Sequence, residues 1–117
     1  MHNILIPSAG GPASICCIKV LRMSGKNYNI VGVDPNPLAA GFFLSDKSYV
    51  VPFAKDEKSL MERTVEVCKT EKIDVIMPTS DFDICVHAKY RRIFEEMNVS
   101  LPFSDYKAQF IYYIILI

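Results

Sequence analysis

The sequence contains no tryptophan and only two histidines, and it has no run of basic residues. Lysines and arginines together number 13, as do aspartates and glutamates, so the formal net charge is zero. A chain without a basic patch is not expected to bind nucleic acid. The sequence also lacks an apolar run long enough to span a bilayer and a signal peptide at its start. No membrane partner is therefore expected, and the chain is predicted to be cytoplasmic.

The four cysteines, Cys16, Cys17, Cys68 and Cys85, lack the spacing of a metal site or a redox motif. We interpret them as small buried hydrophobic residues in a reducing cytosol. No metal-binding residue is predicted in this chain.

Half of the 117 residues are hydrophobic, which is enough for one domain with a buried core. Short apolar segments alternate with amphipathic segments of helical period. The predicted strands are residues 4–6, 29–34, 48–53, 73–78 and 99–103, and the predicted helices are residues 12–24, 55–72 and 81–97. This order and these apolar strands predict an α/β fold, in which helices cover both faces of a mainly parallel sheet.

The turn "SAGGPAS" (residues 8–14) joins the first predicted strand to the first predicted helix. Gly10 and Gly11 would let the backbone approach a ligand closely, and the start of the helix offers N–H groups to an anion. The dinucleotide fingerprint G-x-G-x-x-G is met only at Gly10 and Ala13. Asp34, after the second strand, could bind a ribose hydroxyl or simply open a proline-rich turn. A phosphate site, another ligand and a tight corner all remain open.

The loop after the fourth predicted strand carries Thr79, Ser80, Asp81 and Asp83. These residues could cap the following helix or contact a substrate, and the sequence leaves both possibilities open. His87 lies in the middle of that helix without a partner nearby in the sequence, so we interpret it as structural. No catalytic residue is predicted.

Three stretches together resemble a known family: "ILIPSAGGPASICCIKVLR", "IVGVDPNPLAAGFFLSDKSYVVP" and "IDVIMPTSDFD". They are similar to the N-terminal (pre-ATP-grasp) domain of ATP-grasp ligases, in particular those like the large subunit of carbamoyl-phosphate synthase. The resemblance covers roughly residues 3–107. It implies a Rossmann-like three-layer domain over residues 1–105, with a five-stranded sheet in the order 3-2-1-4-5. Residues 106–117 would begin a connector to ATP-grasp domains.

These ligases phosphorylate a carboxylate with ATP, and an amine or similar nucleophile then attacks the acyl phosphate. The resemblance implies that this domain helps to hold the small-molecule carboxylate substrate. Ser14 stands where the family often has glycine, and Asp46 matches a family position before the third strand. The residues that match the family's substrate-side loops are Gly10, Gly11, Pro12, Ala13, Asp34, Asn36, Thr79, Ser80, Asp81 and Asp83.

No ATP-binding lysines and no metal-binding pair of the family can be assigned in this sequence. The chain alone is therefore expected to hold no cofactor and to be inactive. ATP and Mg²⁺ are implied for the complete protein, where they would be bound by the further domains.

The last eight residues, "FIYYIILI" (110–117), are all apolar or aromatic. A free end of this composition would favour aggregation, so we expect this tail to be buried against the domain or to pair with a second copy in a homodimer. Two alternatives to the ligase hypothesis remain. The chain could be an independent binding or dimerisation module, or a small NAD(P)- or FAD-binding protein.

Overall fold

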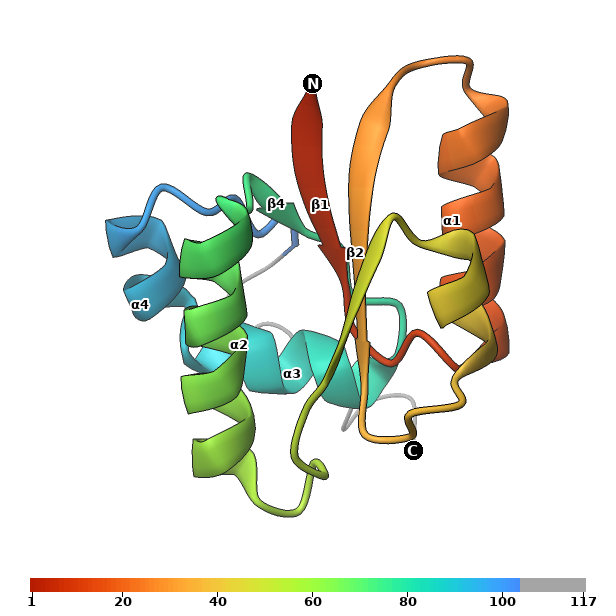
Figure 1. The fold of residues 1–117 in the computed structure, drawn as a ribbon. Helices are drawn as coiled ribbons and strands as arrows, with labels where there is room; N and C mark the ends of the chain where they lie inside the picture. Colours follow the sequence, from red (N-terminus) through yellow and green to blue (C-terminus); the bar gives the residue numbers. More distant parts are fainter. Residues whose placement is uncertain (104–117) are drawn as a thin grey trace.

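The computed structural model of the chain describes residues 1–103, so the tail and its expected pairing lie outside the described residues. A parallel sheet of four strands forms the centre, in the order β3-β2-β1-β4 (Figure 1). The strands are β1 (His2–Ile6), β2 (Tyr28–Asp34), β3 (Lys47–Val50) and β4 (Val75–Ile76). All carboxyl ends therefore lie at one edge of the sheet, which is the lower edge in Figure 1.

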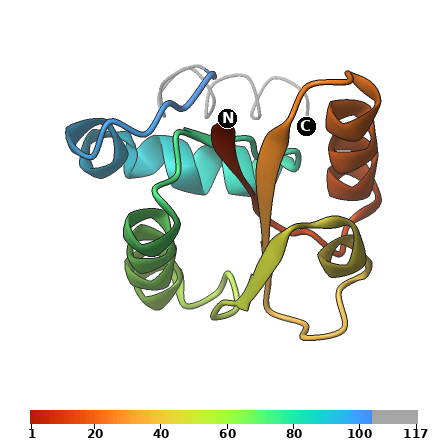
Figure 2. The same cartoon turned by 45° about the horizontal axis from the view of Figure 1, so that its top comes forward.

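Helices cover both faces of this sheet, as predicted (Figures 1 and 2). Helix α1 (Pro12–Met23) and the 3-10 helix η1 (Ala40–Leu44) lie on one face, whereas α2 (Glu57–Glu71), α3 (Asp81–Lys89) and α4 (Arg91–Glu96) lie on the other. Right-handed crossovers require this arrangement, because the chain steps outward from β1 to β3 and then returns past β1 to β4. The result is a Rossmann-like α/β fold with three layers.

A hydrophobic cluster lies on each face of the sheet. Alternate residues of β1 pack into one cluster or the other, because successive side chains of a strand point to opposite faces. Ile4 and Ile6 pack with Ile18 of α1, while Leu5 joins the larger cluster beneath α2, α3 and α4. Phe94 of α4 lies in that larger cluster and is fully buried. The central strand is thus apolar on both sides, which explains its continuous hydrophobic sequence.

The prediction of a fifth strand at residues 99–103 was wrong. Residues 99–103 form one isolated bridge between Ser100 and Val75 rather than a strand. The position is the predicted one, since Ile76 N–H donates to Ser100 O at 3.1 Å and Ser100 N–H donates to Asp74 O at 2.8 Å. The next donor of a parallel ladder would be residue 102. That residue is Pro102, which has no N–H, so the pairing stops there.

The predicted helix 81–97 is two helices, α3 and α4, separated at Tyr90. The Tyr90 backbone has φ −103° and ψ 17°, outside the usual α-helical values. Its N–H donates to His87 O at 3.2 Å, which is a tightened turn rather than a continued α-helix. No glycine or proline marks this break in the sequence.

The four cysteines are free, but they are not uniformly buried as predicted. Cys68 is buried in the larger core, and burial raises the pKa of its thiol to about 12. Cys16 is exposed on the outer side of α1, one residue before the half-buried Cys17. Adjacent helical residues point in different directions, so a neighbouring pair of cysteines cannot face the core together.

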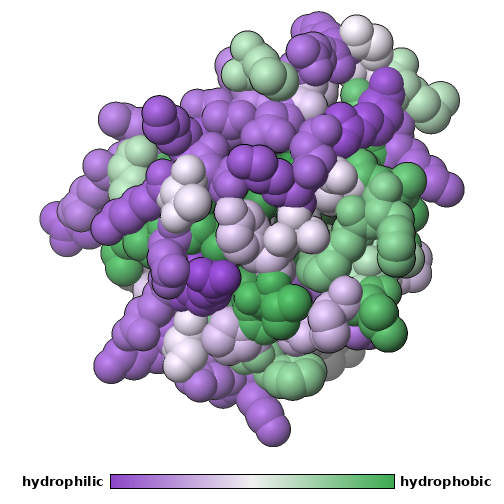
Figure 3. All heavy atoms as spheres, in the orientation of Figure 1, coloured by the Kyte–Doolittle hydropathy of each residue, from purple (hydrophilic) through white to green (hydrophobic). Residues whose placement is uncertain are grey.

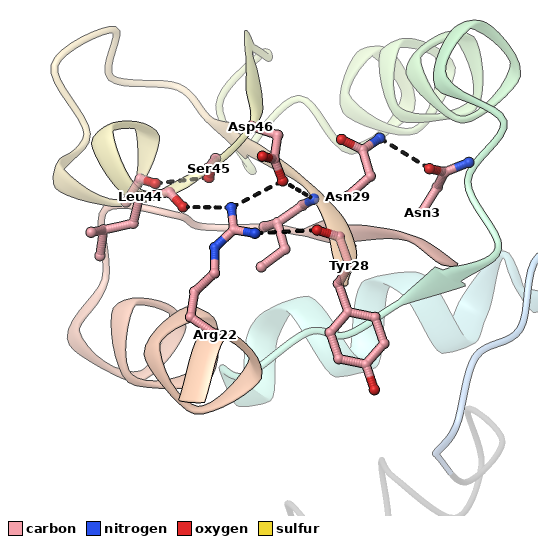
Figure 4. Close-up of polar contacts among 9 residues, drawn as sticks. Asn3, Arg22, Tyr28, Asn29, Leu44, Ser45 and Asp46 are labelled. Atoms are coloured by element: carbon pink, nitrogen blue, oxygen red, sulfur yellow. Dashed lines mark hydrogen bonds and ion pairs between the residues drawn. The ribbon is translucent and has the colours of Figure 1, made fainter. Parts of the chain in front are cut away.

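At the amino end of the strands, Arg22 and Asp46 join α1 to β2 and β3 (Figure 4). The Arg22 guanidinium donates to Asp46 Oδ2 at 2.9 Å, to Leu44 O at 3.0 Å and to Tyr28 O at 3.2 Å. Asp46 Oδ2 also accepts the N–H of Ile30 at 2.8 Å. Asp46 therefore has a structural role at the end of the sheet opposite the glycine turn.

Apolar side chains are exposed on the outer side of α1 and η1. Val20, Met23 and Phe43 are 59%, 83% and 83% exposed, respectively. Figure 3 shows hydrophobic residues gathered over this side of the molecule, on the right, while hydrophilic residues predominate over α2 on the left. Within residues 1–103, no helix has the length and hydrophobicity needed to cross a membrane.

Gly41 permits a close approach between η1 and the turn after β1, and a methyl group there should destabilise the fold. A Cβ at this position would lie 2.0 Å from Ala9 O, the atom that accepts the Gly41 N–H. We expect Gly41→Ala to lower the free energy of unfolding by about 2 kcal/mol or more, measured by urea denaturation. The control, Ala40→Ser at the exposed neighbouring position, should change it by less than about 0.5 kcal/mol. Wild-type stability of Gly41→Ala would contradict this packing.

Candidate functional site

Three loops meet at the carboxyl edge of the sheet: the glycine turn after β1, the loop after β2 and the loop after β4. Since β1 lies between β2 and β4, the first loop is flanked by the other two. In open parallel sheets this edge is where ligands bind, next to the point at which the strand order reverses. Hydrogen bonds between the glycine turn and residues 79–83 show that these two segments lie side by side.

Asp34 ties the glycine turn to the loop after β2. Its Oδ2 accepts the Gly10 N–H at 2.9 Å, and its Oδ1 accepts the Asn36 N–H at 2.8 Å. Asn36 Oδ1 in turn accepts the N–H of Leu38 at 2.9 Å. Both residues therefore brace a proline-rich turn, one of the two roles that the sequence allowed for Asp34.

The surroundings of Gly10 do not favour a dinucleotide at this turn. A Cβ on Gly10 would lie 3.2 Å from both Asp34 Oδ2 and Ala39 Cβ, so the missing side chain is explained by close packing within the protein. The Gly10 N–H, which would otherwise face a phosphate, donates to a carboxylate that would repel one. Pro12 has no N–H, and the Gly11 N–H donates to Ser8 O at 2.9 Å. Only the N–H groups of Ala13 and Ser14 remain for a ligand at the start of α1.

Asp83 ties the glycine turn to α3. Its Oδ2 accepts the hydroxyl of Ser8 at 2.5 Å and the hydroxyl of Ser80 at 2.8 Å. Ser80 is the N-cap of α3, and its Oγ accepts the Asp83 N–H at 3.1 Å. The Asp83 side chain is buried, and Ser8 has a left-handed backbone with φ 51°. Non-glycine residues in this conformation cluster at functional sites.

A second pair of hydroxyls, those of Ser14 and Thr79, also joins the two loops. Ser14 Oγ donates to Pro7 O at 2.9 Å and lies 2.8 Å from Thr79 Oγ1. Because the Ser14 proton is used on Pro7 O, Thr79 is the donor between the two hydroxyls. The Ser14 side chain is buried between these two loops.

His87 lies beneath the site, one helical turn after Asp83. It is 1% exposed, and its Nδ1 donates to Asp83 O at 2.7 Å. The ring stacks on Phe94, with 5.9 Å between ring centroids. Burial lowers the pKa of His87 despite the nearby Asp83 carboxylate, which acts in the opposite direction. The imidazole is therefore neutral at pH 7, with its proton on Nδ1.

Most of the predicted site residues take part in hydrogen bonds between the loops, and the others are exposed at the carboxyl edge of the sheet. Asp34, Thr79, Ser80 and Asp83 contact the neighbouring loops or caps described above, together with Gly10 and Gly11. Pro12, Ala13, Asn36 and Asp81 are exposed at the same edge. Sequence reasoning missed Ser8, Ser14 and His87 as members of the site. Of these three residues, only His87 could have been assigned to the site from the sequence, because a residue four positions after Asp83 lies on the same face of a helix.

The charge of this edge is negative. None of the ion pairs formed within residues 1–103 involves Asp34, Asp81 or Asp83. The helix starts of α1 and α3 offset part of this charge through their dipoles. The described residues contain no cluster of three side chains able to ligate a metal ion. The arrangement is suited to hydroxyl or amine groups, which donate hydrogen bonds, more than to a phosphate.

Comparison with known proteins identifies a family and a fold. The family model described as "PylC-like, N-terminal domain" matches residues 4–101. No curated protein sequence matches the chain. The structure is similar to the biotin carboxylase subunit of a pyruvate carboxylase, with a TM-score of 0.70 and 17% identity, covering 93% of this chain and 24% of that one.

Two further biotin carboxylases share the fold. The domain from a single-chain bacterial carboxylase has a TM-score of 0.69 and 14% identity, covering 93% of this chain and 25% of that one. The domain of 2-oxoglutarate carboxylase from Hydrogenobacter thermophilus, a dimer in complex with MgADP, ADP and bicarbonate, has a TM-score of 0.65 and 16% identity. It covers 92% of this chain and 24% of that one. The chain thus spans about a quarter of the length of these proteins.

Stability should depend on pH through His87. Because burial lowers the pKa of His87 below its ordinary value of 6.5, the unfolded chain takes up the proton more readily than the folded chain. The free energy of unfolding should fall as the pH drops below 6.5, by up to about 1.4 kcal/mol per pH unit, and this group should have no effect at higher pH.

Urea denaturation across this range should show a smaller slope in His87→Phe than in the wild type. The control, His2→Phe at an exposed position, should keep the wild-type slope. Equal slopes in wild type and His87→Phe would show that the buried ring does not resist protonation.

Proposed function

Because the chain belongs to the family of PylC-like N-terminal domains, we propose that it is the substrate-side domain of an ATP-grasp ligase, which joins a carboxylate to an amine with ATP. The observation that carries this proposal is the family match over residues 4–101. The fold shared with biotin carboxylases supports it. A closer relation to the large subunit of carbamoyl-phosphate synthase remains an expectation from the sequence.

In this proposal the carboxyl edge of the sheet holds the non-nucleotide substrate. Its loops are fixed by one buried and two partly buried hydrogen bonds at Ser8, Ser14 and Asp83, so the edge is organised before a ligand arrives. Pre-organised polar groups orient a substrate at low entropic cost. Asp81 is exposed at the first position of α3, where its carboxylate is accessible to a hydroxyl or amine of the substrate.

ATP and Mg²⁺ would bind to ATP-grasp domains rather than to this substrate-side domain. The position of Asp34 beside the glycine turn supports this division of roles, because its carboxylate already accepts the Gly10 N–H. The domain would then contribute no group to phosphoryl transfer. Its own task would be to position the acid or the nucleophile beside the acyl phosphate that forms in the neighbouring domain.

Calorimetry with MgATP tests this division. We expect no micromolar binding to the 117-residue chain, and MgATP binding only when the chain is joined to, or combined with, an ATP-grasp domain. In that assembly, Asp81→Asn should raise the KM for the non-nucleotide substrate about tenfold, as expected for the loss of a hydrogen bond to a charged group. The KM for ATP should be unchanged.

The matched control is Glu62→Gln, which alters an exposed carboxylate of α2 away from this edge. It should leave both KM values unchanged. Micromolar affinity of the isolated chain for MgATP would contradict the proposal. So would a rise in the KM for ATP in Asp81→Asn.

A further inference from the structure

A small cavity of about 40 Å³ lies under the carboxyl ends of β1 and β2, beside the site described above. Ser8, Asp83, His87 and Thr64 form its polar wall, and prolines and aliphatic residues such as Val33 form the rest. A cavity of at least about 10–15 Å³ can hold one water molecule. This cavity is therefore large enough for a group of two or three non-hydrogen atoms.

One buried polar atom beside the cavity has no partner. His87 Nε2 is inaccessible to solvent and makes no hydrogen bond within the described part of the chain. The other ring nitrogen carries the proton, because Nδ1 donates to Asp83 O. Nε2 therefore presents a lone pair, and a buried acceptor without a donor is costly. His87 is one of the residues that line the cavity.

The other polar side chains of the cavity wall also have no hydrogen-bond donor available for an occupant. The Thr64 hydroxyl donates to Leu60 O at 2.8 Å, and the Ser8 hydroxyl donates to Asp83 Oδ2. Asp83 is a carboxylate, which accepts only. No lysine or arginine is among the described residues that line the cavity. An occupant must therefore donate several hydrogen bonds, and a positive charge on it would compensate the buried carboxylate.

We propose that this cavity is a subsite for a primary ammonium group, carried on a short methylene stem by a small-molecule ligand. The ammonium group supplies three N–H donors to Ser8 Oγ, Asp83 and His87 Nε2. The apolar wall at Val33, Val51 and Leu60 packs against the stem. Carboxylates and phosphates are excluded, because every polar group of the wall is an acceptor or carries negative charge.

This inference deepens the proposed function, since it places the amine-bearing end of a substrate in this domain. Its test is nevertheless independent of any ATP-grasp partner. Binding of an amine to the 117-residue chain requires neither ATP nor catalysis. Failure of the ligase proposal would leave the ammonium subsite intact, and failure of the subsite would leave the ligase proposal intact.

The test is a titration of the ¹⁵N-labelled full chain with methylammonium chloride at constant ionic strength, followed by NMR. We expect saturable shifts of the His87 ring nitrogens and of the Ser8 and Asp83 amides. Tetramethylammonium, which has the same charge but no N–H donor, and acetate, which has the opposite charge, should produce no saturable shift at these nuclei.

Two variants identify the site. His87→Phe removes the acceptor and keeps a planar ring, and it should weaken methylammonium binding at least about tenfold, as expected for a hydrogen bond to a charged group. Ala54→Leu enlarges a half-buried apolar residue of the cavity lining and leaves the polar groups in place, and it should have a similar effect. The matched controls, His2→Phe and Ala40→Leu at exposed positions, should bind like the wild type.

Three results would overturn the proposal. The first is the absence of a saturable shift with methylammonium, which would mean that water alone occupies the cavity. The second is an equal response to methylammonium and tetramethylammonium, which would indicate a general effect of cations. The third is wild-type binding by a folded Ala54→Leu variant, which would place the amine elsewhere.

Discussion

The carboxylate of Asp83 is the group on which the carboxyl edge of the sheet depends. Its Oδ2 accepts hydroxyl protons from Ser8 in the glycine turn and from Ser80 at the start of α3. Its backbone carbonyl orients the ring of His87. Asp83 thus holds the glycine turn against the start of α3, and it fixes the proton of His87 on Nδ1. Removing the carboxylate would leave the partly buried hydroxyls of Ser8 and Ser80 without this acceptor.

The two ends of the sheet have different tasks. At the amino end, Arg22 and Asp46 join α1, β2 and β3 through partly exposed ion-pair and backbone contacts. At the carboxyl end, the buried side chains of Ser14 and Asp83 connect the glycine turn to the loop after β4, and a cavity lies beneath them. A parallel α/β sheet favours this division, because every strand ends at the same edge and the helix starts face it.

Sequence reasoning could predict the features that depend on periodicity and on chain direction. Apolar strands and amphipathic helices indicated the parallel sheet with two helical layers, and the carboxyl-edge rule brought the glycine turn next to Asp83. The fifth strand is lost because Pro102 stands where the next N–H donor to β4 would be. The sequence does not show the register that places Pro102 at this position. The break at Tyr90 and the left-handed Ser8 depend on tertiary contacts and carry no local signal. The role of Asp34 as a brace and the partners of His87 likewise required coordinates.

A double-mutant cycle between Ser8 and Asp83 tests most directly whether this carboxylate holds the edge together. The stability of wild type, Ser8→Ala, Asp83→Ala and the double variant would be measured by urea denaturation. The structure predicts a coupling energy of about 1 kcal/mol or more between these residues, because they share a short, partly buried hydrogen bond. A parallel cycle of Asp83 with the exposed Ser48 should give a value below about 0.5 kcal/mol. Strict additivity of the Ser8 and Asp83 substitutions would contradict the account.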